Sequence, residues 1–220
     1  MKVCTDACVF GALVAGHMQP GVTGKILDIG CGTGLLSLML AQKTDAGIDA
    51  VEVNSAAALQ AKENVHASPW ADRITIHRAD IREFVPTEKY GLIISNPPFF
   101  ESDLRSPDEH KNTAKHDTGL KLDELMACIS RHIRDAGTAA ILLPYHRTAM
   151  AEGLAMNERL FLQKKVLIRQ TAEHDFFRSV LFFSPVKKAN PGLETMAIHD
   201  NNRQYTETFS GLLKDYYLNC

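Results

Sequence analysis

Residues 25–34 read KILDIGCGTG, an apolar run that leads straight into a turn with three alternate glycines. Helix-forming residues, apolar almost all round, follow from Leu35 to Gln42. A buried strand, a glycine-rich turn and a buried helix in this order are typical of the first crossover of a parallel sheet. Glycines in such a turn let the backbone approach a ligand closely and direct N–H groups at it from the start of the helix.

Two residues distinguish this turn from one that binds a dinucleotide. Leu35 stands where the dinucleotide fingerprint has its last glycine or alanine. Asp28 comes directly before the turn, where a carboxylate would repel a pyrophosphate but would suit a ligand with a positively charged amino group. The turn therefore favours S-adenosylmethionine over NAD, with Gly30, Gly32 and Gly34 beside the ligand.

A second informative stretch is ISNPPFF, residues 94–100. The apolar run 90–94 predicts a buried strand, and the two prolines end it because neither has an N–H for the ladder. Ligands of open α/β sheets bind at the carboxyl ends of strands. Asn96 and the adjacent carbonyls would there hold a planar amine, with the rings of Phe99 and Phe100 beside it. Taken alone, an Asn-Pro-Pro-aromatic run is equally well explained as a rigid loop.

Two more strands are predicted to end in acidic residues. Residues 47–53 form an apolar run that contains Glu52, whose carboxylate can accept hydrogen bonds from both hydroxyls of a ribose. The alternative is a solvated acid at the end of a strand. Residues 73–80 alternate apolar and polar side chains and end in Asp80. Asp80 either accepts the amino group of an adenine or caps a short helix over residues 81–84.

The rest of the chain continues the alternation of strands and helices. Helices are expected at 7–18, 55–67 with Asn54 as its cap, 121–134, 145–157 and 206–217, and strands at 138–143, 159–169 and 176–185. The polar stretch 101–118 is either a solvated loop or a mobile lid whose cations meet phosphates. A basic region is either a phosphate-contacting face or scattered surface charge: Lys164, Lys165, Arg169, Arg178, Lys187 and Lys188.

The amino-acid composition limits the classes of protein to which this chain can belong. The 220 residues are 45% hydrophobic and 23% charged, as in a globular domain, and the net charge of −2 argues against a bulk nucleic-acid binder. Five scattered cysteines favour reduced thiols in a cytoplasmic protein over disulfides or a metal site. The sequence has no apolar run long enough for a membrane span and no signal peptide. We therefore expect one domain over residues 1–220, with no metal and no membrane.

Together, the stretches at 28–34 and 96–99 resemble class I S-adenosylmethionine-dependent methyltransferases that act on exocyclic or amide nitrogens. The likeness extends over almost the whole chain to one bacterial family, the valine tRNA adenine-N6 methyltransferases, which modify the adenosine 3′ of the anticodon. It is carried by MKV-x-TD at 1–6, LL-x-LMLAQ at 35–42, EN at 63–64, SPWA at 68–71, SP at 106–107, QYTE at 204–207 and KDYY at 214–217.

This resemblance implies an α/β, Rossmann-like fold with a seven-stranded, mostly parallel sheet of order 3-2-1-4-5-7-6, helices on both faces and an antiparallel last strand. It implies S-adenosylmethionine as cofactor, held with neighbouring residues at Thr5, Asp6, Asp28, Gly30, Gly32, Gly34, Leu35, Glu52, Val53, Asp80, Ile81 and Asn96. Catalysis is expected at Asn96, Pro97, Pro98 and Phe99, and substrate binding at Phe99, Phe100, Arg105, Lys111 and Lys115. The expected partner is the anticodon stem-loop of a tRNA, bound by a monomer in the cytoplasm.

One departure and two rivals qualify this interpretation. Family members carry a further Phe- and Gln-rich segment before the Met-Lys-Val, and a chain that lacks it would bind cofactor yet transfer methyl groups poorly. The Asn-Pro-Pro-aromatic motif indicates that a nitrogen is methylated but not which molecule carries it. The bases rRNA guanine and DNA adenine and the side chain of protein glutamine therefore remain alternative acceptors. A non-catalytic, methyltransferase-like RNA-binding subunit is the rival from another class, although Asp28, Glu52 and Asn96 are all present.

The Phe99→Ala variant tests the stacking role expected of this ring. A ring that stacks on the acceptor base contributes about 1–3 kcal/mol to its binding. We expect the variant to bind the acceptor roughly ten-fold more weakly and to bind S-adenosylmethionine normally. Calorimetric titrations with each ligand measure both affinities, and an equal loss for the two would count against stacking.

Overall fold

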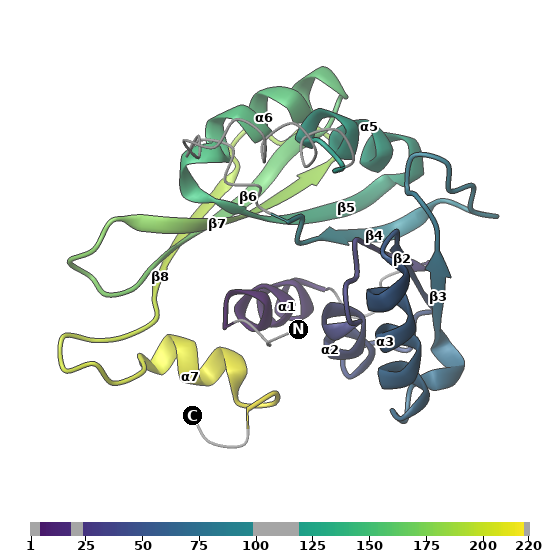
Figure 1. The fold of residues 1–220 in the computed structure, drawn as a ribbon. Coiled ribbons are helices and arrows are strands. Elements are labelled where there is room, and N and C mark those ends of the chain that lie inside the picture. The colour runs from purple at the N-terminus through teal and green to yellow at the C-terminus, as the bar shows by residue number, and fades with distance from the viewer. Residues whose placement is uncertain (1–4, 19–23, 99–118, 218–220) are drawn as a thin grey trace, which may run out of the picture.

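The computed structural model describes residues 5–18, 24–98 and 119–217. At its centre lies an eight-stranded sheet of order β3-β2-β1-β4-β5-β7-β6-β8 (Figure 1). The strands are β1 Ile26–Ile29, β2 Ile48–Glu52, β3 Ile74–Arg78, β4 Tyr90–Ser95, β5 Ile133–Pro144, β6 Phe161–Arg169, β7 Phe176–Ser184 and β8 Gly192–Ala197. Only β7 runs antiparallel to both of its neighbours, β5 and β6.

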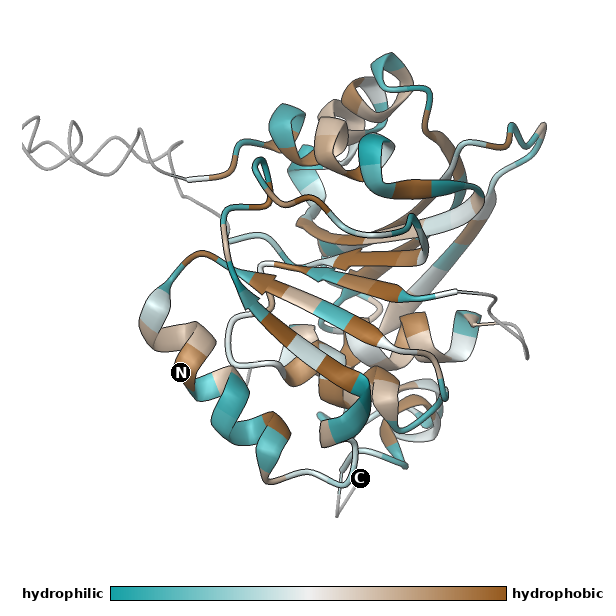
Figure 2. Ribbon diagram, turned by 90° about the vertical axis from the view of Figure 1, so that its right-hand side faces the viewer, coloured by the Kyte–Doolittle hydropathy of each residue, from teal (hydrophilic) through white to brown (hydrophobic). Residues whose placement is uncertain are grey.

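Helices cover both faces of this sheet. They are α1 Thr5–His17, α2 Leu35–Ala41, α3 Ser55–His66, α5 Leu122–His132, α6 Thr148–Asn157 and α7 Glu207–Leu213, with short 3₁₀ turns η1 Ala71–Arg73 and η2 Tyr145–Arg147. In Figure 1, α5 and α6 lie on one face, and α1, α2, α3 and α7 lie on the other. Figure 2 shows the apolar residues gathered on the strands and on the inward sides of the helices.

The alternation of side chains along each strand divides the core into two layers. On β1, Ile26 packs with Phe10 of α1 and Leu40 of α2, whereas the next residue, Leu27, packs with Ile129 of α5 on the other face. Successive side chains of a strand point to opposite faces, so a strand buried on both faces is apolar throughout. This explains the continuous apolar run that precedes the glycine turn.

The predicted fold class and strand order are confirmed, but the predicted strand count was wrong. The eighth strand, β8, pairs in parallel with β6 and is the outermost strand on that side of the sheet. Of its residues only Met196 is buried, and its sequence, GLETMA, has neither alternation nor β-branched enrichment. Edge strands that bury little give a weak sequence signal. Residues 81–83 also form a turn, where a short helix over residues 81–84 was one of the alternatives.

A polar cross-link ties together the four strands β3, β2, β1 and β4. Asp49 on β2 lies 2.9 Å from His77 Nε2 on β3 and accepts a 2.9 Å hydrogen bond from the hydroxyl of Tyr90 on β4. Lys25, just before β1, approaches the same carboxylate at 3.5 Å. Burial alone would raise the pKa of Asp49, but the hydrogen bonds from His77 and Tyr90 and the charge of Lys25 outweigh it, so the pKa is lowered.

Among the described residues, no helix combines the length and the apolar character that crossing a membrane requires.

The Tyr90→Phe variant measures this cross-link. Its loss leaves one buried carboxylate oxygen of Asp49 short of a donor, which costs about 1–3 kcal/mol of unfolding free energy near pH 7. The folded-state pKa of Asp49 lies below its ordinary 3.8, so the stabilisation is complete above about pH 5 and is lost as the pH falls through the folded-state value.

Urea titrations of wild type and Tyr90→Phe from pH 3 to pH 8 follow this difference. Tyr205→Phe is the control, because that side chain is 44% exposed and should change the free energy by less than about 0.5 kcal/mol. A difference between wild type and Tyr90→Phe that stays constant down to pH 3 would contradict the assignment to Asp49.

Candidate active site

The site is organised by one row of residues across three neighbouring strands. Val51 of β2, Ile29 of β1 and Ser95 of β4 stand side by side in the register of the sheet. The Ser95 hydroxyl is buried and donates a 2.9 Å hydrogen bond to the Ile29 carbonyl, which pins the ends of β1 and β4 together. The next residue of each strand therefore lies at the carboxyl end of the sheet, about 5 Å from its neighbour. These residues are Glu52, Gly30 and Asn96. We call this row of strand ends the edge of the sheet.

The glycine turn leaves β1 in a left-handed conformation that favours glycine. Gly30, Gly32 and Gly34 have φ values of 71°, 56° and 83°. A Cβ at Gly30 would meet no atom within 4 Å, whereas one at Gly34 would touch Ala61 at 3.5 Å. A contact of 3.5 Å is an ordinary packing distance, so it is the positive φ that favours glycine at position 34, and Gly30 borders open space at the edge of the sheet. An open, positive-φ glycine at this point fits the close approach of a ligand.

Glu52 connects the turns that follow β1 and β2. One of its carboxylate oxygens accepts a 2.9 Å hydrogen bond from the Gly32 N–H, and the other accepts one of 2.8 Å from the Asn54 N–H. The Gly32 N–H is therefore directed at this carboxylate, although the sequence suggested that it faces a ligand. A carboxylate has about four acceptor positions, so Glu52 retains capacity for two hydroxyl donors. The adjacent Val53 is 65% exposed and offers an apolar surface beside it.

Asp28 is buried completely with its hydrogen bonding only half satisfied. Its Oδ2 accepts a 2.7 Å hydrogen bond from the Ser37 hydroxyl on α2, but its Oδ1 has no partner among the described residues. Burial raises the pKa of Asp28 to about 7, although the Ser37 hydrogen bond acts in the opposite direction. A buried acceptor without a donor is costly. It fits a ligand that brings a positively charged amino group, directly or through a bridging water.

Asp80 is already engaged by a neighbouring arginine. Arg82 donates to its carboxylate from the backbone N–H at 2.9 Å and from the guanidinium at 2.5–3.1 Å. Arg82 also binds Glu124 at 3.2 Å, and the hydrogen bonds from Arg82 lower the pKa of Asp80. The carboxylate therefore remains ionised and oriented, and an adenine amino group would share it with Arg82. Ile81, between the two, is buried.

The structure describes the first part of the Asn-Pro-Pro motif. Asn96 and Pro97 are partly exposed and Pro98 is exposed, at the end of the buried strand β4. No described residue forms a hydrogen bond with the Asn96 side chain. With no partner among the described residues, the oxygen of this amide is available to an N–H donor. The expected substrate residues lie outside the described residues: Phe99, Phe100, Arg105, Lys111 and Lys115.

The start of α1 reaches the same edge farther along the sheet. Asp6, in the first turn of α1, accepts a 2.8 Å hydrogen bond from Nε of Arg178 on β7. Arg178 stands opposite Pro144, the last residue of β5, and Thr5 beside Asp6 is exposed. This pair spans 172 residues, and the sequence indicated it only by a cation within the otherwise apolar strand FFRSVLFFS.

The basic region suggested by the sequence is not one continuous face. Lys164 and Lys165 point to opposite sides of β6 and bind Glu194 and Glu152, each at 2.9 Å. Lys187 and Lys188 follow the end of β7, which lies at the opposite edge from Asn96. The more conservative interpretation, of scattered surface charge, therefore describes these lysines better.

The Asp28→Asn variant tests the charge state of the buried acid. The folded-state pKa is about 7 and the ordinary value is 3.8, so unfolding releases a proton between these pH values and the wild type loses stability as the pH rises from 4 to 7. An isosteric amide keeps the Ser37 contact and removes this loss. We expect the variant to be more stable at pH 8 by an amount on the order of 4 kcal/mol.

Urea unfolding of both proteins at pH 5, 6, 7 and 8, without added ligand, measures the difference between their free energies of unfolding. This difference should shrink as the pH falls. Parallel pH profiles for the two proteins would mean that Asp28 is not titrating in this range. The same variant should bind a ligand with an ammonium group more weakly than the wild type, which calorimetry measures independently of stability.

Comparison with known proteins places this arrangement in a family. Residues 6–114 match the model of the methyltransferase small domain. A tRNA1(Val) (adenine(37)-N6)-methyltransferase from Dyadobacter fermentans is 39% identical over 99% of this chain and 91% of its own length. One from Pectobacterium carotovorum is 38% identical, with 99% and 88% covered.

Solved structures are similar in fold at much lower sequence identity. A protein described as a predicted O-methyltransferase from Agrobacterium tumefaciens is 18% identical, covers 95% of both chains and superposes with a TM-score of 0.73. A glycopeptide N-methyltransferase in complex with S-adenosyl-L-methionine is 11% identical, with 81% of this chain and 94% of that chain covered and a TM-score of 0.60. On the strength of its full-length relatives, the chain belongs to the family of tRNA1(Val) (adenine(37)-N6)-methyltransferases.

Proposed function

We propose that the chain transfers the methyl group of S-adenosylmethionine to the exocyclic N6 of adenosine 37, next to the anticodon of a valine tRNA. The observation that carries the proposal is the row of strand ends in which Gly30 lies between Glu52 and Asn96. It puts an open glycine turn, suited to a cofactor, beside an amide suited to an aromatic amine. The names of the full-length relatives supply the acceptor.

The cofactor side of the site consists of acids that differ in environment. The unsatisfied Oδ1 of Asp28 would receive the amino group of the methionine part. The carboxylate of Glu52 would accept the ribose hydroxyls, while Val53 would contact the adenine and Asp80 its amino group. Gly30 leaves room for this ligand, which supplies a sulfonium-activated methyl group when it is bound. Ser37, Asn54 and Arg82 keep these acids in place.

The acceptor side must make a poor nucleophile react. The lone pair of an aromatic exocyclic amine is delocalised into its ring. The side-chain oxygen of Asn96 and the carbonyl oxygen of Pro97 would each accept one N–H, which draws the nitrogen toward tetrahedral geometry and frees the lone pair. Their dipoles also stabilise the positive charge that develops on the nitrogen. No general base is required, since the product cation readily loses its proton.

The target base must leave its stack to reach Asn96. Flipping is inexpensive in an anticodon loop, whose bases are unpaired, and single-stranded loops are the usual targets of sequence-specific RNA recognition. Phe99 would stack on the extruded adenine. In this proposal the partner is tRNA, the 220 residues act as one methyltransferase domain, and the enzyme works as a monomer in the cytoplasm.

One assay separates this acceptor from the others. The protein is incubated with methyl-labelled S-adenosylmethionine and, separately, with total tRNA, rRNA, DNA or protein. Label in tRNA that digestion locates on N6-methyladenosine next to the valine anticodon supports the proposal. Label in another polymer would identify a different acceptor for the same chemistry, and no label in any polymer would favour a non-catalytic binding subunit.

The Asn96→Ala variant tests the catalytic amide. Removing one of two acceptors that act on the developing charge should lower the rate of transfer to tRNA about 10²- to 10³-fold, with cofactor affinity within a few-fold of wild type. Single-turnover transfer and calorimetry measure the two quantities. Asn157→Ala, at an exposed position at the end of α6, is the control and should transfer normally. Lost cofactor binding in Asn96→Ala would show that the role of Asn96 is misplaced.

A further inference from the structure

A group of aromatic and basic side chains lies beyond the ends of β5 and β6. Tyr145 follows β5, Arg169 ends β6 and Phe176 begins the antiparallel β7, so all three lie at the edge that carries Asn96. The rings of Tyr145 and Phe176 are 5.5 Å apart between centroids, and the Arg169 guanidinium carbon lies 5.5 Å from the centre of the Phe176 ring. We call Tyr145, Phe176 and Arg169 the edge cluster.

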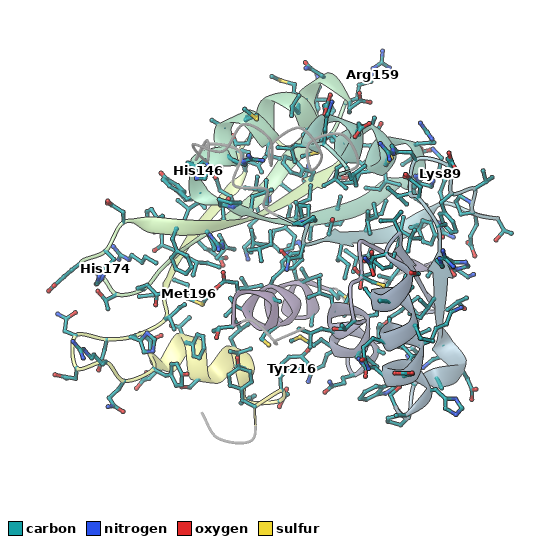
Figure 3. The ribbon with its side chains drawn as sticks, viewed as in Figure 1. Lys89, His146, Arg159, His174, Met196 and Tyr216 are labelled. Carbon is teal, nitrogen blue, oxygen red and sulfur yellow. The ribbon has the colours of Figure 1, made fainter. Side chains whose placement is uncertain are left out.

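The edge cluster lies beyond the other half of the same row of strand ends: it follows β5 and β6, whereas Gly30 and Glu52 follow β1 and β2. In Figure 3, His146, next to Tyr145 in sequence, and His174, two residues before Phe176, lie at one end of the long strands, and Lys89, just before β4, lies at the other. Because Ser95 stands opposite Ile141 on β5, Asn96 is level with the following residue. Tyr145 is three residues farther along, about 10 Å away.

Tyr145 is held in place although its side chain is 42% exposed. Its carbonyl oxygen accepts a 2.7 Å hydrogen bond from the Thr148 hydroxyl. That hydroxyl oxygen also lies 2.8 Å from the hydroxyl oxygen of Ser179 on β7, and both side chains are buried. These buried hydroxyl groups fix the turn. A ligand could therefore bind the Tyr145 ring without the entropy cost of ordering a mobile loop.

The charge of Arg169 is not neutralised by a carboxylate within the described part of the chain. Its Nη1 donates a 2.7 Å hydrogen bond to the Ala172 carbonyl, which orients the guanidinium. Other basic side chains of β6 and β7 are paired with acids: Lys164 with Glu194, Lys165 with Glu152, and Arg178 with Asp6. A planar cation without an acid, next to the partly exposed ring of Phe176, is suited to stacking with a base and to meeting a phosphate.

We propose that the edge cluster is a stacking subsite for an unpaired RNA nucleotide that adjoins the methylated adenosine. This inference rests on the proposed function and extends it to a second nucleotide. Tyr145 and Phe176 would support the base, and Arg169 would face its phosphate or its ring. Proteins that read single-stranded RNA combine aromatic rings and arginine planes in this way. The subsite would hold the anticodon loop open while the neighbouring adenosine is bound at Asn96.

The experiment compares ring and charge variants on a defined RNA. Tyr145→Leu removes the ring and Arg169→Gln removes the charge, while Tyr145→Phe retains the ring. Lys187→Gln is the matched control, since Lys187 lies over the Phe161 ring at 5.1 Å but at the opposite edge. Binding of a labelled valine anticodon stem-loop is followed by fluorescence anisotropy in the presence of S-adenosylhomocysteine. Two further RNAs lack the base on one side or the other of the target adenosine.

The proposal predicts that Tyr145→Leu and Arg169→Gln raise the Kd for RNA, and the KM for methyl transfer, about ten-fold. We expect kcat, the cofactor Kd and the thermal midpoint to be unchanged, and Tyr145→Phe and Lys187→Gln to behave as wild type. One of the two abasic RNAs should bind wild type about ten-fold more weakly, yet bind Tyr145→Leu no more weakly than the intact RNA does.

The remaining outcomes separate this inference from the proposed function. An RNA Kd that Tyr145→Leu leaves unchanged, or an abasic penalty that persists in that variant, overturns the subsite even if tRNA is methylated. Binding of RNA without methyl transfer would refute the proposed function, while the Kd comparison still decides the subsite. A loss confined to transfer onto a glutamine-containing peptide would assign the edge cluster to a protein acceptor and overturn the proposal.

Discussion

The hydrogen bond from the Ser95 hydroxyl to the Ile29 carbonyl fixes the geometry on which the site depends. Two parallel strands that are neighbours in the sheet but far apart in sequence must end at the same level, or a cofactor at one and an acceptor at the other could not meet. Transfer of a methyl group requires the two reacting atoms in line and within van der Waals distance, so small shifts in register would be expensive. Pro97 then prevents β4 from continuing past this level.

The acids of the site are held in contrasting electrostatic states. Asp28 is buried without a cation among the described residues, whereas Asp80 is fully paired with Arg82. Glu52 lies between these extremes, bound by two backbone N–H groups. An unpaired buried acid favours a ligand that carries positive charge, and it disfavours one that carries phosphate. This distinction was expected from the position of Asp28 in the sequence, and the burial in the structure gives it a physical cause.

Sequence reasoning succeeded where the pattern was local. The strand, turn and helix at residues 25–42 and the strand before Asn96 predicted the central strands, and Asn54 was correctly predicted to cap α3. It failed where structure depends on distant partners. Neither the Arg178–Asp6 pair nor the Gly32–Glu52 hydrogen bond leaves a periodic trace. The half-exposed strand β8 was missed for a related reason, because its pairing with β6 supplies the stability that its own side chains do not.

The eight strands divide the sheet edge between two tasks. Strands β1 to β4 lead into the acids, the glycine turn and Asn96, whereas β5 leads into Tyr145, β6 ends in Arg169 and the antiparallel β7 begins with Phe176 at the same end. A small amine would need only the first half, because Glu52 and Asn96, which we propose bind the ribose and orient the nitrogen, are there. The second half is useful to an acceptor that extends well beyond the reacting base. Since Thr148 and Ser179 hold the backbone turn that carries the exposed Tyr145, the fold maintains this surface, and an acceptor the size of RNA would give it a use.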